Sequence, residues 1–268
     1  MKVVVHGFWH LGCVTAACLA AAGKRVVGLD PDAAVVESLR RGEPPIQEPG
    51  LPELLRAGLD AGRLDFTTDA AAALDGADVL WVAFDTPVDA RDEADVGAVR
   101  ARLDAVREAV RPGTLVLVSS QVPAGFTRAL ARDWALPGVT YGYSPENLRL
   151  GSAIRVFQEP ERVVIGLGDP ADRPRAEALF APYARRIEWM SIESAEMTKH
   201  AINAFLAASV AFANEVARLC ERVGADASEV ARGLKSEGRI GPKAYLAPGP
   251  AFAGGTLARD LRSEEPHV

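Results

Sequence analysis

The sequence predicts an α/β protein: an N-terminal, doubly wound parallel sheet of the Rossmann type, followed by a helical domain built on one long helix. Short β-branched runs alternate with helical stretches up to about residue 190, which is typical of βαβ units. From Ser194 to Val223 there is neither a strand signal nor a helix breaker, so we expect one helix of about 45 Å. We place the domain boundary near Ile192, with residues 1–192 in the first domain and 193–268 in the second.

The first βαβ unit illustrates the pattern. The β-branched run Val3–Val5 predicts a strand that leads to Gly7. Small, helix-favouring residues follow from Leu11 to Ala22, and Gly23 ends that helix. Further strands are expected at residues 25–30, 64–67, 79–83, 115–119, 139–143, 162–166 and 186–190, and further helices at 33–41, 51–61, 96–110 and 228–234.

Composition excludes several classes of protein. Of the 268 residues 49% are hydrophobic, which is enough for a sizeable core. The net charge is −6 and no basic run is present, so we expect no nucleic-acid surface. No window reaches the ~18 apolar residues of a membrane span, so no membrane insertion is expected. The apolar start mimics a leader peptide, but His6, Gly7 and His10 interrupt it and a second strand follows.

Cysteine and histidine usage points away from disulfides and metals. Cys13, Cys18 and Cys220 are sparse and odd in number, so we expect them to be buried, unpaired residues of a cytoplasmic protein. His6 and His10 have no Cys or carboxylate at ligand spacing, so no metal site is expected.

A dinucleotide fingerprint begins where the first strand ends. Residues 7–12 read Gly-Phe-Trp-His-Leu-Gly, and Asp30 ends the second strand, where a ribose-binding acid belongs. The middle glycine of G-x-G-x-x-G is Trp9, whose indole should crowd a pyrophosphate unless the loop is reshaped. The alternative is a nucleotide-type fold that has lost its dinucleotide. The residues expected to bind NAD here are Gly7, Trp9, His10, Leu11, Gly12 and Asp30.

Lys199 and Asn203 lie four residues apart, on one face of the long helix. Beside a nicotinamide, a desolvated lysine amine could take the proton of an alcohol as hydride leaves, and the asparagine could hold the same oxygen. The alternative is a lysine that reaches the surface and an asparagine that makes a structural contact.

Two carboxylates complete the candidate site. Glu146 follows a predicted strand, at the sheet edge where α/β proteins bind ligands. Asp260 follows the flexible pair Gly254-Gly255. Taken alone, a carboxylate at the position of Glu146 is more often an ordinary loop residue, and the alternative for Asp260 is a helix N-cap.

Several short segments, in order along the chain, resemble the UDP-glucose/GDP-mannose dehydrogenase family from Met1 to about Leu261. The matching segments are Arg41-Gly42-Glu43, Glu48-Pro49-Gly50-Leu51, Thr86-Pro87, Val122-Pro123 with Gly125, Ser144-Pro145-Glu146, Ser194-Ala195-Glu196-Met197 with Lys199 and Asn203, Asn214-Glu215, Arg239-Ile240-Gly241-Pro242, Pro248-Gly249 and Gly254-Gly255.

The resemblance implies two NAD-dependent oxidations of the 6-hydroxyl of a nucleotide sugar to a carboxylate. It also implies a Rossmann domain, a helical middle domain whose long helix forms a homodimer, and a third, nucleotide-binding domain. It assigns catalysis to Lys199, Asn203, Asp260 and Glu146, further cofactor contacts to Thr86, Pro87 and Gln121, and substrate contacts to Glu146, Leu148, Lys199, Asn203, Gly254 and Gly255.

The chain departs from the family where the second oxidation takes place. The family's glycine-rich loop carries a cysteine that captures the aldehyde as a thiohemiacetal. Here residues 254–260 read Gly-Gly-Thr-Leu-Ala-Arg-Asp, one residue short and without cysteine. Gln121 replaces a threonine thought to position a water, and Leu150 replaces a glutamate linked to thioester hydrolysis.

These losses predict a reaction limited to two-electron alcohol/aldehyde chemistry. The sequence stops soon after Asp260, so the family's third domain is expected to be absent. Two alternatives stay open. One is a β-hydroxyacid-dehydrogenase-like enzyme acting on a smaller substrate, and the other is a non-catalytic nucleotide-binding or dimerising remnant, which Trp9 and the missing cysteine favour.

Overall fold

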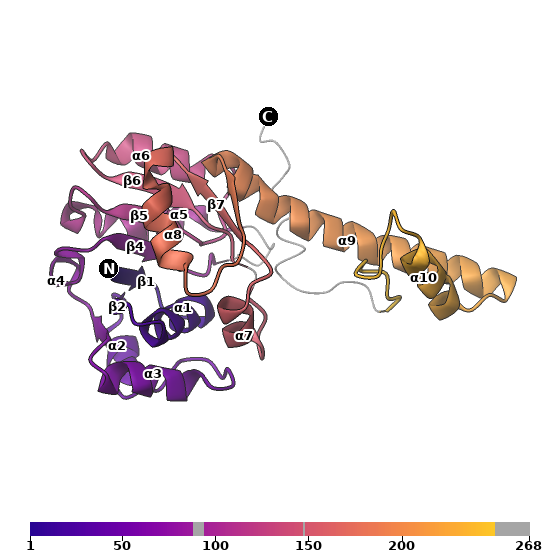
Figure 1. The fold of residues 1–268 in the computed structure, drawn as a ribbon, viewed down its shortest axis with the longest axis horizontal. Coiled ribbons are helices and arrows are strands. Elements are labelled where there is room, and N and C mark those ends of the chain that lie inside the picture. Colours follow the sequence, from indigo (N-terminus) through magenta and orange to yellow (C-terminus); the bar gives the residue numbers. More distant parts are fainter. Residues whose placement is uncertain (88–93, 147, 250–268) are drawn as a thin grey trace. The chain divides into compact units, whose positions relative to one another are not determined.

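The computed structural model describes residues 1–87, 94–146 and 148–249. Most of these residues form one β-sheet together with the helices that flank it (Figure 1). The chain divides into two compact units. The first comprises Met1–Pro87 and Asp95–Met197, and the main part of the second begins at Thr198.

The first unit contains an eight-stranded sheet in the order β3-β2-β1-β4-β5-β6-β7-β8. Every neighbouring pair is parallel except β6 and β7, which are antiparallel. The chain order reverses between β1 and β4, as in doubly wound folds, so the predicted fold class is confirmed. The strands are β1 (Lys2–His6), β2 (Arg25–Leu29), β3 (Leu64–Thr67), β4 (Val79–Val82), β5 (Leu115–Val118), β6 (Thr140–Tyr143), β7 (Val163–Leu167) and β8 (Ile187–Met190).

Helices cover both faces of the sheet, so the central strands β1, β4 and β5 are buried on two sides. In β1, Val3 and Val5 face one core while Val4 faces the other, because successive side chains of a strand point to opposite faces. The first core is completed by α1 (His10–Ala21), α2 (Ala33–Arg40), α3 (Leu51–Asp60), α7 (Ala153–Gln158) and α8 (Arg173–Phe180), and the second by α4 (Ala70–Leu74), α5 (Val96–Asp104), α6 (Phe126–Trp134) and the start of α9 (Ile192–Val223).

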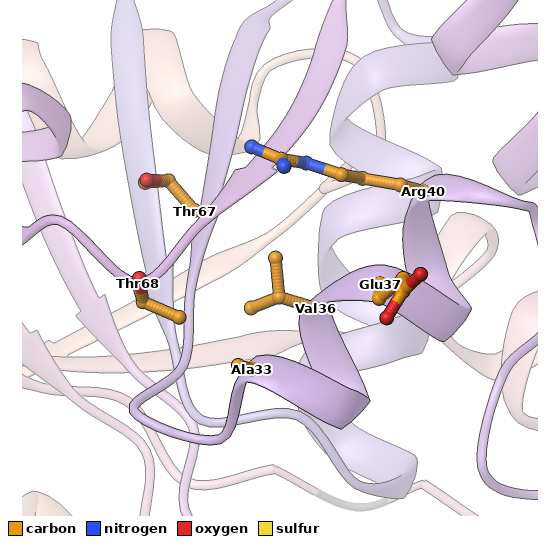
Figure 2. A pocket seen from close by; sticks show the side chains of 6 residues that line it. All are labelled: Ala33, Val36, Glu37, Arg40, Thr67 and Thr68. Atoms are coloured by element: carbon orange, nitrogen blue, oxygen red, sulfur yellow. The ribbon is translucent and has the colours of Figure 1, made fainter.

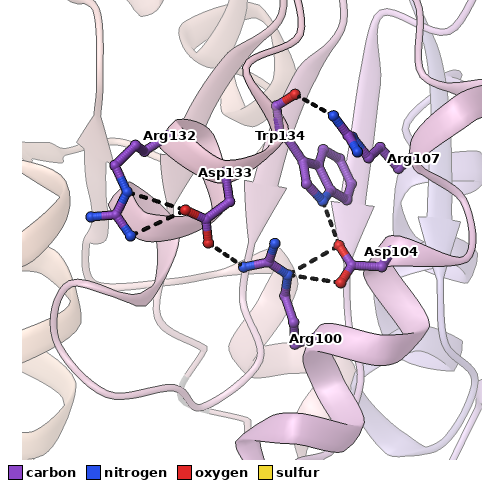
Figure 3. A network of polar contacts seen from close by, with 6 residues as sticks. All are labelled: Arg100, Asp104, Arg107, Arg132, Asp133 and Trp134. Carbon is purple, nitrogen blue, oxygen red and sulfur yellow. Dashed lines mark hydrogen bonds and ion pairs between the residues drawn. The ribbon is translucent and has the colours of Figure 1, made fainter.

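Helix α5 ends at Asp104, six residues before the predicted end at Val110. Val106 and Val110 are buried at helical spacing from Leu103, which is why periodicity alone extends the helix. The Asp104 carboxylate instead accepts bonds from Arg100 Nε at 3.0 Å and from the indole of Trp134 at 2.7 Å, which ties α5 to α6 (Figure 3).

The second unit contains most of α9 and all of α10 (Ala227–Ser236). Gly224 ends α9 with a φ of 73°, a conformation that glycine adopts without strain. Asp226 then caps α10 by accepting the N–H groups of Ser228 and Glu229. Neither α9 nor any other helix in the described ranges is long and apolar enough to cross a membrane.

Candidate functional site

Five of the residues expected at the site lie near one edge of the sheet. Gly7, Asp30, Thr86, Gln121 and Glu146 directly follow, or lie within a few residues of, the carboxyl ends of β1, β2, β4, β5 and β6. These strands run parallel, so their carboxyl ends share an edge. In open α/β sheets this edge, at the point where the strand order reverses, is where ligands bind.

The glycine loop brings α1 unusually close to β1. A Cβ added at Gly12 would lie 1.9 Å from the carbonyl oxygen of Gly7, and one added at Gly7 would lie 2.3 Å from the ring of Phe84. Gly7 also has a φ of 98°. Both glycines are therefore required by the backbone, as the first and last glycines of a dinucleotide fingerprint are.

Asp30 stabilises this loop from the end of β2. Its Oδ2 accepts the N–H of Phe8 at 2.9 Å, and its Oδ1 accepts the N–H of Asp32 at 3.0 Å. A carboxylate has about four acceptor positions, so capacity remains for the hydroxyls of a ribose. The sequence placed Asp30 correctly at the strand end, but its role in shaping the loop appears only in the structure.

Trp9 occupies the N-cap of α1 with a φ of −127°, so its backbone does not require glycine. Its side chain is 50% exposed. The first turn of α1 contains no acidic residue, which leaves the positive end of the helix available for an anion such as a pyrophosphate. The expected crowding by the indole stays a prediction.

Two loops at this edge are joined by Thr86, whose hydroxyl donates to the carbonyl of Gln121 at 2.6 Å. The loop after β6 begins at Ser144, whose hydroxyl donates to the Val164 carbonyl at 2.9 Å. Glu146 then accepts the N–H of Leu148 on its Oε2 at 2.6 Å. The carboxylate of Glu146 is thus held by its own loop.

A pocket of about 340 Å³ lies at the same edge, between α2 and the end of β3 (Figure 2). Glu37, Arg40 and the hydroxyls of Thr67 and Thr68 supply its polar groups, and Ala33 and Val36 supply its apolar lining. Arg40 is held in place by a bond from its Nε to the Phe66 carbonyl at 2.9 Å. Sequence reasoning did not identify this pocket.

Glu196 anchors the start of α9 to the first unit. It is fully buried and accepts the N–H groups of Gly125 at 2.6 Å and Thr127 at 2.9 Å, at the beginning of α6. Burial raises its pKa, although these donors oppose that shift. In the sequence, Glu196 stood out only as part of the matching family segment Ser194–Met197, and its hydrogen bonds to the start of α6 were not predicted.

Lys199 and Asn203 lie one turn apart on α9, and both are largely buried, at 8% and 7% exposure. The structure therefore does not show the surface-exposed lysine of the alternative interpretation. Asp260, Gly254 and Gly255 lie outside the described residues. Cys13, Cys18 and Cys220 are buried and unpaired, as predicted.

Profiles of one family match nearly the whole chain. The NAD-binding domain of the UDP-glucose/GDP-mannose dehydrogenase family matches residues 1–184, and its central domain matches residues 193–263.

Individual relatives agree with these profiles. The chain is 37% identical to a UDP-glucose 6-dehydrogenase of Pseudomonas aeruginosa, with 98% of this chain and 60% of the relative aligned. It is 32% identical to a GDP-mannose 6-dehydrogenase of the same organism, with 98% and 63% aligned. The structure of a UDP-glucose dehydrogenase from Pyrobaculum islandicum superposes with a TM-score of 0.89 at 36% identity, covering 98% of this chain and 62% of that one. The chain thus spans about 60% of the length of these relatives.

Proposed function

The chain belongs to the UDP-glucose/GDP-mannose dehydrogenase family, and from this premise we propose that it is an NAD-dependent oxidoreductase acting on the CH–OH group of a nucleotide sugar. The main support for the proposal is the close approach of α1 to β1. A Cβ added at Gly12 would lie 1.9 Å from the carbonyl oxygen of Gly7, and Asp30 accepts a hydrogen bond from the same loop.

These residues fit a dinucleotide. Gly7 and Gly12 keep side chains out of the turn, the first turn of α1 offers N–H groups without a competing acid, and Asp30 retains acceptor positions for a ribose. Thr86, Pro87 and Gln121 would line the same edge nearer the nicotinamide. NAD, when bound, supplies the hydride acceptor.

The protein's own part of the reaction is proton transfer and orientation. The amine of Lys199 takes the hydroxyl proton of the substrate, and the amide of Asn203 holds the same oxygen. Both side chains are buried on one face of α9, where water competes little for such contacts. Glu146 and Asp260 would complete the contacts to substrate and water, together with Leu148, Gly254 and Gly255.

We restrict the reaction to two electrons because none of the three cysteines in these 268 residues is suited to capture an aldehyde. Burial raises the pKa of Cys18 to about 12, and burial also raises the pKa of Cys13. A thiol is a weak nucleophile compared with its thiolate, so neither residue suits covalent catalysis. Cys220 is also buried, and residues 254–260 contain no cysteine.

We further propose a homodimer formed through α9, in the cytoplasm. Phe205, Phe212 and Leu219 recur every seven residues, which places them along one stripe of the helix, and they are 69%, 51% and 57% exposed. Exposed apolar stripes of this kind are typical of helix–helix interfaces. The three unpaired cysteines fit a reducing compartment.

The test begins with calorimetric titration of NAD and NADH, followed by a screen of UDP- and GDP-sugars for NADH formation. We expect one NADH per sugar and an aldehyde that can be trapped with hydroxylamine. Lys199→Ala should lower kcat by about 10²-fold or more while leaving NADH binding intact.

Other outcomes would replace the proposal. Two NADH per sugar and a carboxylate product would contradict the two-electron limit. Turnover of small β-hydroxy acids alone would favour the smaller-substrate alternative. No binding of either nucleotide would favour the non-catalytic remnant, and an unchanged rate in Lys199→Ala would remove that residue from its role.

A further inference from the structure

One buried carboxylate bonds both to the start of α1 and to the loop that follows Glu146. Glu48 is 4% exposed and lies just before α3. Its Oε2 accepts hydrogen bonds from Nε2 of His10 at 3.1 Å and from the N–H of Gly151 at 2.8 Å. Its Oε1 accepts the N–H of Ala153 at 2.9 Å. Because a carboxylate only accepts, His10 donates from Nε2.

Together, the hydrogen bonds that Glu48 accepts affect its pKa more strongly than burial does. Burial by itself raises the pKa of this carboxyl, but the donors from Gly151, Ala153 and His10 reverse that effect and hold the pKa below its ordinary value of 4.5. Glu48 is therefore ionised at neutral pH. Removing any one donor would leave a buried anion less well compensated.

The loop after β6 is attached to the rest of the first unit at both of its ends. Ser144 fixes its beginning, by bonding to β7 through Val164, and Glu48 fixes its end through Gly151 and Ala153. Glu146 lies between the two attachments and is oriented by Leu148. Glu48 thus fixes the end of the loop that carries Glu146.

His10 is the first residue of α1, within the loop where the dinucleotide would bind. His10 and Gly151 share a single oxygen of Glu48, so a movement of one alters the bond to the other. We propose that Glu48 is a positioning residue that couples the dinucleotide loop to the loop carrying Glu146, so that nucleotide binding at α1 orders the substrate-side carboxylate. This inference rests on the proposed function.

The coupling can be tested first without any nucleotide, by residue-resolved amide hydrogen exchange on the full chain. His10→Ala touches neither Gly151 nor Ala153, yet it should raise exchange at both amides about tenfold or more. Glu48→Gln should do the same. The matched control is Glu43→Gln, which removes the same charge from an exposed carboxylate whose partner is Arg41 on the surface, and it should leave both amides unchanged.

The second measurement adds NADH. In the wild type, saturating NADH should slow exchange at Gly151 and Ala153 about tenfold, and this protection should be lost in Glu48→Gln even at saturation. With a nucleotide sugar, Glu48→Gln should lower kcat more than it raises KM for NAD, because the carboxylate acts through Glu146.

The outcomes separate the two proposals. Unchanged exchange at Gly151 and Ala153 in His10→Ala, or NADH binding without protection there, would overturn the coupling while leaving the proposed function intact. If NADH does not bind, the proposed function is overturned, and the His10→Ala result alone then supports or overturns the coupling between the two loops.

Discussion

Replacing Gly12 with alanine should destabilise the Rossmann unit through a single steric contact. The new Cβ would lie 1.9 Å from the Gly7 carbonyl oxygen, whereas real Cβ contacts essentially never fall below 3.0 Å. Either α1 or the Gly7 peptide must therefore move by about 1 Å. Residues Leu11–Ala20 of α1 are all buried, so such a movement disturbs the packing along the whole helix.

We expect a loss of about 3 kcal/mol in the free energy of unfolding, at the upper end of typical overpacking costs, and a fall in Tm of about 6–12 °C. All four tryptophans (Trp9, Trp81, Trp134 and Trp189) lie in the first unit, so tryptophan fluorescence during thermal unfolding reports on that unit. Binding of NADH should be lost as well, because the altered turn is the one that would approach the pyrophosphate.

The control is the same substitution at Gly233, which lies within α10 and where an added Cβ meets no atom within 4 Å. Gly233→Ala should stabilise α10 by about 0.5–1 kcal/mol, measured by far-UV circular dichroism. If Gly12→Ala unfolds within a degree of the wild type and still binds NADH, the steric argument for the fingerprint glycine is wrong.

Three other predictions concern charge, the unusual tryptophan and the long helix. The pKa of Glu48 in the folded protein is held below its ordinary value of 4.5, so the ionised carboxylate stabilises the fold above pH 4.5, and this stabilisation is lost as the pH falls through the folded-state pKa. Between about pH 6 and 3, the Tm should therefore fall less steeply for Glu48→Gln than for the wild type. Trp9→Gly should lower the Kd for NADH about tenfold in calorimetry, because the indole at the N-cap of α1 is expected to crowd the pyrophosphate, and an unchanged Kd would show that the half-exposed indole does not obstruct the cofactor. Phe212→Glu should raise the dimer Kd about tenfold or more in analytical ultracentrifugation by placing a charge in the proposed apolar stripe, whereas an unchanged dimer would place the interface elsewhere.

Much of the fold could be read from local sequence. Strand-like runs, several of them β-branched, located the eight strands of the sheet to within about two residues, a margin usual for element ends. The antiparallel β6–β7 pair was not foreseen, because a strand's own pattern does not reveal the direction of its neighbour. The end of α5 was also misplaced, because Val106 and Val110 keep helical spacing beyond the helix.

The sequence by itself determined the α/β class, the fingerprint glycines, the acid at the end of β2 and the helical pair Lys199 and Asn203. Each depends on neighbours within about a helical turn, or on a short βαβ unit. Only the tertiary structure decided that Glu48 bonds to amides 103 and 105 residues away, and that Glu196 bonds to the Gly125 amide 71 residues away. A buried carboxylate needs donors, but which distant backbone groups supply them is set by how helices pack on the sheet, and no local pattern records that choice.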